Sequence, residues 1–259
     1  MYQKSTHFLL ELIQNADDNH YEVQDPTLHL TYGKKHLRVD CNEIGFSPKD
    51  VDAICSIGQS SKAGAGVSTQ YVGEKGIGFK SVFKAADVVW VSSQAYEFKF
   101  DRNVKLGMIA PILADFPGKR PQWTSFYLQL AGGYDVQELI SDLDGLDARL
   151  LIFLRRLRKI VITIVGANDI PSTRTLTRAE GEIEGKESIH LREDGKGMNY
   201  LVIRYRARNL PPEEKRDGVR ESELLLAFPV DDDNQPKLDA QEVFAFLPIR
   251  DYGFKVPPS

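Results

Sequence analysis

A short segment near the start of the chain carries a carboxylate and an amide at helical spacing. Glu11, Asn15 and Asp18 lie four and three residues apart, so a helix places them on one face. A carboxylate one turn from an amide can activate a water molecule and help to hold a hard cation through oxygen ligands. Taken alone, the pattern is weak, and an exposed polar helix face is the favoured interpretation.

A glycine-rich run further along the chain is suited to an anion. GEKGIGFKS spans Gly73–Ser81, and its glycines let the backbone approach a ligand closely. A helix that begins near Ile77 adds free N–H groups at the favourable end of its dipole. The spacing is not that of a P-loop, and no expected strand precedes the run, which disfavours a dinucleotide-binding turn. The run therefore predicts a phosphate cradle.

A third polar segment, DCNEIGF at Asp40–Phe46, follows an expected strand. A polar residue at a strand end can read a base edge, and Gly45 permits a tight chain reversal. A plain strand-end turn fits this segment equally well.

Helices and strands must position these segments. Apolar residues at helical spacing predict a helix over Thr6–Asn19, and alternation predicts strands at Leu28–Tyr32 and Leu37–Asp40. Ser47-Pro48 begins a helix that we expect to end near Ser56. A long loop is expected over 57–76, because glycines punctuate it. Later helices are expected at 77–86, 135–143 and 149–157, and later strands at 88–92, 96–100, 126–130, 160–164, 200–205, 224–228 and 243–247. No helix or strand is predicted for the polar stretch from 166 to 196.

Composition bounds the possibilities. The chain has 259 residues, 42% of them hydrophobic, and a net charge of -4, which gives no push toward nucleic acid or an anionic membrane. Two cysteines without CxxC or paired-His spacing predict neither a disulfide framework nor a zinc site. No leader or membrane-length apolar run is seen. We expect an intracellular protein, cytoplasmic or nuclear, and a chain that is a fragment of a longer protein or a short gene product.

In this order, the three segments resemble the nucleotide-binding boxes of the GHKL ATPases, the superfamily of gyrase, the ninety-kilodalton heat-shock chaperones, histidine kinases and MutL. They are most similar to the sacsin-like and plant NO VEIN-like branch. The resembling segments are ELIQNADDN (Glu11–Asn19), NEIGFSPKDVDAICSIGQSSK (Asn42–Lys62) and YVGEKGIGFKSVF (Tyr71–Phe83). The combination is specific, although it covers only about the first third of the chain. A late stretch, Val243–Lys255, also looks like the segment that follows this domain in NO VEIN-like proteins.

The resemblance implies a role for each matching residue. Glu11 corresponds to the general base, Asn15 to the magnesium ligand, and Asp18 to an acidic residue that shapes the nucleotide pocket. A mobile lid would begin at Ser60-Ser61-Lys62, and Thr124 would lie near the adenine. The ATP-binding residues implied beyond Asn15 and Asp18 are Asn42, Gly45, Ser60, Ser61, Lys62, Gly73, Gly76, Ile77, Gly78, Phe79 and Thr124.

One position departs from the superfamily pattern. The aspartate that reads the adenine amino group is replaced by Cys41, and Glu43 stands in place of a glycine. Asp40 is one residue away and points to the opposite face of a strand. Asn42 can accept from an amino group and donate to a ring nitrogen. The recognition of adenine is therefore left open.

The resemblance implies an α+β fold: a Bergerat-type two-layer sandwich of helices on a mixed, mostly antiparallel sheet, with a partial second α/β region. We expect an ATP-binding domain at 1–165 and, at 166–259, a β-rich extension that starts a following domain. The implied function is Mg-ATP binding with slow hydrolysis coupled to lid closure, in chaperone-like or regulatory work.

The alternative is a non-hydrolysing nucleotide-binding or scaffold module of a larger protein. A histidine kinase is disfavoured, because no phospho-accepting helix precedes the domain. The expected cofactors are ATP and magnesium. The expected partners are a nucleotide and protein clients or a following domain, with a homodimer open and neither nucleic acid nor membrane indicated.

Overall fold

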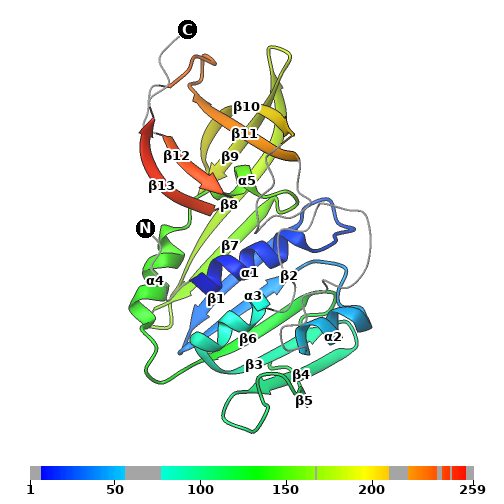
Figure 1. Cartoon of the computed structure of the whole chain (residues 1–259). Coiled ribbons are helices and arrows are strands. Elements are labelled where there is room, and N and C mark those ends of the chain that lie inside the picture. The colour runs from blue at the N-terminus through cyan, green and yellow to red at the C-terminus, as the bar shows by residue number, and fades with distance from the viewer. Residues whose placement is uncertain are drawn as a thin grey trace.

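A mixed sheet of eleven strands forms the frame of the molecule in the computed structural model (Figure 1). The structure describes residues 7–55, 77–166, 168–209, 221–237, 241–245 and 247–254. Along the sheet the strands follow the order β11-β10-β9-β8-β7-β1-β2-β6-β3-β4-β5. Their bounds are β1 Thr27–Gly33, β2 His36–Cys41, β3 Ala86–Ser93, β4 Tyr96–Asp101, β5 Ile112–Leu113, β6 Thr124–Leu130, β7 Lys159–Val165, β8 Pro171–Ile183, β9 Lys186–Glu193, β10 Lys196–Arg208 and β11 Glu221–Val230. Two further strands, β12 (Gln241–Ala245) and β13 (Leu247–Phe254), form a separate antiparallel pair.

Strands β1 and β2 lie near the middle of this sheet and form a hairpin. Leu28 and Leu30 alternate along β1 and are completely buried, as a half-buried strand requires. The turn at Lys34-Lys35 has positive φ at both residues, 48° and 63°, which matches the twist of a two-residue hairpin. On its other edge β1 pairs in parallel with β7, whereas the other described strand pairs are antiparallel.

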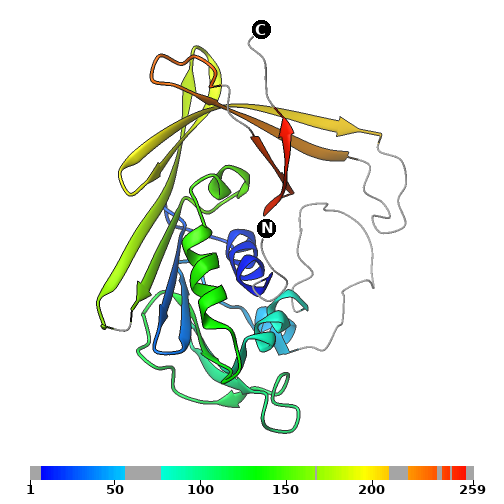
Figure 2. The same ribbon diagram turned by 90° about the vertical axis from the view of Figure 1, so that its left-hand side faces the viewer.

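The helices are few and short. Their bounds are α1 His7–Asp18, α2 Pro48–Cys55, α3 Ile77–Lys80, α4 Val136–Gly145 and α5 Leu150–Phe153, with a 3-10 turn η1 at Ser81–Lys84. Viewed along the edge of the sheet, α1, α3 and α4 lie on the same side of β1 and β2 (Figure 2). Leu9 and Ile13 of α1 are fully buried in the core, and each such side chain contributes about 1.5–3 kcal/mol on burial. None of the described helices is long and apolar enough to cross a membrane.

The predicted Bergerat-type two-layer sandwich with a partial second α/β region is wrong. The structure has one eleven-stranded mixed sheet in the described residues, and strand outweighs helix throughout it. The physical reason lies in the polar stretch after residue 165, which forms β8 and β9 rather than a break in the sheet. β7 pairs with β8 from Lys159↔Thr177 to Val165↔Pro171, so the sheet continues across residue 165. The division into domains at that residue stays a prediction.

The sequence pattern missed β8 because most of its side chains are exposed or half-buried. β8 shows only two buried residues, Leu176 and Arg178, in a strand of thirteen. Alternation of apolar residues is therefore weak, and the strand is held by its hydrogen-bond ladders to both neighbours. The expected strands at 88–92, 96–100, 126–130, 160–164, 200–205 and 224–228 are confirmed, with wider bounds. The late strand expected at 243–247 is a hairpin, β12–β13.

Two expected helices differ in detail. The helix expected over 77–86 consists of α3 followed by η1. The helix expected over 149–157 ends after one turn, at Phe153. The loop expected over 57–76 lies outside the described residues.

Candidate functional site

A cavity of about 90 Å³ lies beside α1, over β1 and β2. The described residues that line it come from α1, α2, α3, three strands and the loop after β2. They are Leu12, Asn15, Ala16, Asn19, Leu28, Val39, Cys41, Phe46, Asp50, Ala53, Ile54, Phe79 and Phe126. We call this the α1 cavity. α1 and α3 contact one another directly and lie side by side in Figure 1, although about sixty residues of sequence separate them.

One stripe of α1 faces this cavity. Leu12, Asn15 and Asn19 line it, at the spacing of three and four residues that shares a helix face. Glu11 and Asp18 are half-buried on α1 and are not among the residues that line it. The structure thus brings Asn15 to the cavity and adds Asn19, which the sequence analysis missed. The signal was present, because Asn19 follows Asn15 by one helical turn.

The end of α1 is fixed by a buried carboxylate, Asp17. Its side chain is 5% exposed. Its oxygens accept the backbone N–H groups of Arg155, Arg156 and Leu157, at 2.8, 2.8 and 2.9 Å. Three hydrogen bonds to one ionised group are a strong local restraint. They also hold residues 155–157 out of helical geometry, which explains why α5 ends early.

Arg156 makes a second set of contacts with the end of α1, and we call these contacts and those of Asp17 the clamp. Its Nη1 donates to the carbonyl oxygens of Asp18 at 2.6 Å and Asn19 at 2.8 Å. These carbonyls are the unpaired acceptors that a helix leaves at its C-terminus. Asp17 and Arg156 therefore tie α1 to the segment that leads into β7, and so fix the helix that carries Glu11 and Asn15.

Two residues that line the cavity, Ala16 and Cys41, are joined by hydrogen bonds through Tyr21. Tyr21 Oη donates to the Ala16 carbonyl oxygen at 2.6 Å and lies 2.9 Å from Cys41 Sγ. Because the single phenol proton is used by Ala16, the thiol of Cys41 must donate to Tyr21. Burial raises the pKa of Cys41 to about 12, so the thiol stays neutral. Toward the cavity, Cys41 presents sulfur lone pairs and no proton.

Asn42 stabilises the backbone beside the cavity. Its Oδ1 accepts the Thr27 N–H at 2.6 Å, and its Nδ2 donates to the Asp25 carbonyl oxygen at 3.0 Å. The amide is thereby engaged at both ends, and Asn42 does not line the α1 cavity. The geometry gives Asn42 a structural task, and its role in reading a base stays an untested prediction.

The loop after β2 turns at Gly45, whose φ is +92°. Few residues other than glycine adopt this value. A Cβ at Gly45 would also collide with the side chain of Gln94, whose Nε2 donates to the Ile44 carbonyl oxygen. The left-handed backbone at Gly45 is compatible with the tight reversal that the sequence analysis allowed there.

Thr124 is not among the residues that line the cavity. It is 1% exposed, and its Oγ1 is 2.6 Å from Ser93 Oγ. Ser93 Oγ in turn accepts the Phe46 N–H at 2.8 Å. Thr124 therefore positions Phe46, which lines the cavity, and acts on the pocket indirectly.

Helices α2 and α3 close the cavity through capping contacts. Asp50 Oδ2 accepts both the N–H of Ser47, at 2.9 Å, and its hydroxyl, at 2.7 Å, which is the reciprocal half of a capping box. Lys80 Nζ donates to the carbonyl oxygens of Ile54, at 2.6 Å, and Met108, at 2.7 Å. Burial lowers the pKa of Lys80. This lysine anchors the end of α2, so its charge is engaged within the fold.

Aromatic rings form the wall opposite α1. Phe79 is 5% exposed and packs against Phe126, with ring centroids 5.4 Å apart. Phe46 contacts the same ring of Phe126 from 6.2 Å. The three rings give the α1 cavity an apolar side suited to a flat ligand.

Several predicted residues lie outside what the structure describes. Ser60, Ser61, Lys62, Gly73 and Gly76 are in this group. Ile77 and Gly78 are described only as backbone at the start of α3. The lid and most of the phosphate cradle therefore stay predictions.

The structure combines one eleven-stranded mixed sheet with a helix-walled cavity of aliphatic, aromatic and amide side chains. No protein-family profile matches the chain. It is similar to Protein NO VEIN of Arabidopsis thaliana, with 33% identity over 286 aligned positions that cover 98% of this chain and 10% of that protein. The chain thus spans about a tenth of the length of this curated relative. The similarity to NO VEIN is confirmed, and the wider GHKL assignment stays a prediction.

Proposed function

We propose that the α1 cavity is the base end of a Mg-ATP site, and that the chain hydrolyses ATP slowly as part of a lid-closing conformational cycle. One observation carries the proposal. Asn15, one turn after Glu11, lines the same cavity as Phe79 of α3, the helix that completes the glycine run. The amide and the expected phosphate cradle come from distant parts of the chain, and the contact between α1 and α3, the described end of the glycine run, supports their proximity.

The residues present fit these groups in kind. The amide oxygen of Asn15 is a ligand that magnesium accepts, and the Phe46, Phe79 and Phe126 rings suit a purine face. The cavity of about 90 Å³ is smaller than the ~300 Å³ at which ligand pockets begin. It therefore accommodates the deep end of a nucleotide, and the phosphates would extend toward the start of α3. Bound magnesium would neutralise phosphate charge, while Glu11 would take a proton from the attacking water.

The neutral thiol of Cys41 bears on which nucleotide the cavity selects. Cys41 offers sulfur lone pairs, which are weak acceptors, and its own proton is directed at Tyr21. A base amino group is tolerated there without the strong pairing that a carboxylate would provide. We therefore expect stacking and shape to dominate, and a preference for ATP over GTP of less than about tenfold, or ~1.4 kcal/mol.

The second candidate is a module that binds nucleotide without hydrolysing it. The observation in its favour is that Glu11 is not among the residues that line the described cavity. The two candidates share the same pocket and differ only in turnover.

Phosphate release from purified protein with Mg-ATP separates them. For the ATPase, Glu11→Ala should abolish release while ATP affinity changes less than about threefold, because a general base contributes ~10²–10⁴-fold to rate. The matched control is Glu22→Ala, an exposed glutamate in the loop after α1, which should release phosphate like the wild type. Normal turnover in Glu11→Ala would refute the assignment of the base. Tight binding without turnover in the wild type would favour the non-hydrolysing module.

A further inference from the structure

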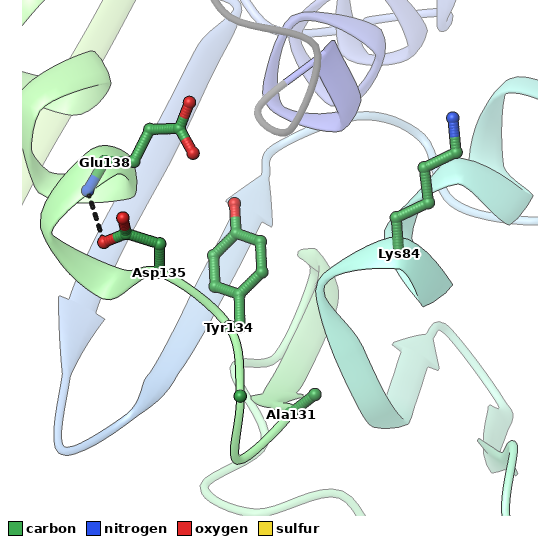
Figure 3. A pocket seen from close by; sticks show the side chains of 6 residues that line it. Lys84, Ala131, Tyr134, Asp135 and Glu138 are labelled. Atoms are coloured by element: carbon green, nitrogen blue, oxygen red, sulfur yellow. Dashed lines mark hydrogen bonds between the residues drawn. The ribbon is translucent and has the colours of Figure 1, made fainter.

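A second cavity, of about 370 Å³, lies between the end of η1 and the start of α4. The residues that line it are Lys84, Ala131, Gly133, Tyr134, Asp135 and Glu138, and Figure 3 shows it from close by. We call this the α4 cavity. It shares no lining residue with the α1 cavity. Its volume falls within the range of about 300–1,000 Å³ that is usual for small-molecule sites.

The wall of the α4 cavity is held in place before any ligand binds. Asp135 caps α4, because its Oδ1 accepts the N–H groups of Gln137 at 3.0 Å and Glu138 at 3.2 Å. The Tyr134 N–H donates to the Ala131 carbonyl oxygen at 3.0 Å. The Tyr134 ring also packs edge-on against Phe8 of α1, with centroids 6.2 Å apart. A preorganised wall of this kind lowers the entropy lost on binding.

Two polar atoms of the residues that line this cavity, Tyr134 Oη and Glu138 Oε1, are buried without a hydrogen-bond partner in the described structure. Asp142 Oδ2, on α4 but outside the lining, is a third such atom. Glu138 and Asp142 lie four residues apart and share a face of α4. A buried polar group left without a partner costs about 1–3 kcal/mol. Such groups are tolerated where a ligand completes them.

The tyrosine in this group keeps its proton. Burial raises the pKa of Tyr134, and the charges of Glu138, Asp142 and Asp135 raise it further. The phenol oxygen is thus a neutral acceptor beside three carboxylates. The described residues contain no group of three or more His, Cys, Asp or Glu side chains placed to hold a metal ion. An organic cation with several N–H donors therefore suits the wall better than a metal.

The opposite side of the cavity carries a positive charge. Figure 3 shows the Tyr134 hydroxyl standing between Glu138 and Lys84, which project from α4 and η1. The cavity thus has an acidic end and a basic end. A ligand with separated charges of opposite sign would match both.

We propose that the α4 cavity binds a small zwitterion with a guanidinium or ammonium group at one end and a carboxylate at the other, as in a free basic amino acid. The cationic group would donate to Glu138 Oε1 and Tyr134 Oη, with Asp142 adding negative charge one helical turn further along α4, and the ligand carboxylate would face Lys84. A guanidinium suits this wall best, because its five N–H donors lie in a plane and pair with carboxylates through two hydrogen bonds.

Calorimetric titration of the full chain with L-arginine tests the proposal. Its neutral isostere L-citrulline should bind at least tenfold more weakly, because it cannot pair with the carboxylates. Agmatine, which lacks the carboxylate, should bind with intermediate affinity. Glu138→Gln should weaken arginine binding by about tenfold, or ~1.4 kcal/mol, the usual loss of a charged hydrogen bond. The matched control is Asp144→Asn, an exposed residue on the same helix, which should bind arginine like the wild type.

Thermal unfolding keeps this result separate from a folding defect. Glu138→Gln should unfold at the wild-type temperature or above, because it removes a buried charge without breaking a hydrogen bond of that atom. The absence of arginine binding at millimolar concentration would overturn the proposal, as would equal affinities for arginine and citrulline or unchanged binding by Glu138→Gln. Equal binding of a doubly capped arginine peptide would also overturn it, because the site would then accept a protein side chain.

Discussion

The polar groups around the two cavities differ in whether they have hydrogen-bond partners within the protein. Around the α1 cavity, Tyr21, Cys41 and Asn42 have partners within the fold. In the α4 cavity, Tyr134 Oη and Glu138 Oε1 are buried without one. The first set is completed by contacts between residues 5 to 20 positions apart in the chain, and the second lies on a locally folded turn and helix.

This difference separates structural from ligand-facing polar groups. A polar group that is satisfied inside the protein contributes to stability, and its removal leaves a partner unpaired. A buried group that lacks a partner gains one only when a ligand arrives. We therefore expect substitutions around α1 to change the free energy of unfolding, and substitutions in the α4 cavity to change ligand affinity alone.

The largest effect is expected at Asp17. Asp17→Ala leaves three backbone N–H groups without their acceptor and should lower the free energy of unfolding by about 3–5 kcal/mol. Urea denaturation measures it, with Asp25→Ala, an exposed aspartate, as the control that stays within ~0.5 kcal/mol. A loss below ~1 kcal/mol for Asp17→Ala would show that the clamp does not fix α1.

The buried thiol gives a pH-dependent effect. The pKa of Cys41 is raised from 9.0 to about 12, so the unfolded chain loses this proton first as the pH rises. The stabilisation is complete below pH ~9 and falls by up to about 1.4 kcal/mol per pH unit above it. Between pH 9 and 10, Cys41→Ala should lose less stability than the wild type. Equal slopes in urea denaturation series at the two pH values would contradict a buried, neutral Cys41.

A smaller effect is expected at the start of α2. Asp50→Ala removes the acceptor of both Ser47 hydrogen bonds and should cost about 1 kcal/mol of stability. Lys49→Ala, exposed on the same turn, should change the unfolding midpoint little. If both variants unfold alike, Asp50 serves the cavity rather than the cap.

Sequence reasoning predicted the local elements well and the long-range ones poorly. The helical spacing around Leu12 and Ile13 and the alternation in Leu28 and Leu30 are signals contained in short segments, and α1 and β1 follow them closely. The continuation of the sheet past residue 165 carries no such signal, because β8 relies on ladder pairing instead of apolar side chains.

The candidate site shows the same limit of sequence reasoning, because contacts between distant residues leave no local pattern. Asp17 and Asp18 are neighbours of identical type, and the sequence analysis assigned the functional role to Asp18. The structure buries Asp17 and pairs it with backbone 138 to 140 residues away. No local pattern contains that contact. By contrast, Asn15 was singled out by the resemblance to the GHKL boxes, and it does line the cavity.

The central claim is that the α1 cavity binds Mg-ATP, and titration calorimetry tests it most directly. Wild-type protein should bind Mg-ATP, and Asn15→Ala should weaken binding by about tenfold or more, equivalent to ~1.4 kcal/mol. Gln24→Ala, an exposed change in the loop after α1, should bind like the wild type. No heat of binding with ATP or ADP at millimolar concentration, or equal affinity in Asn15→Ala, would contradict the account.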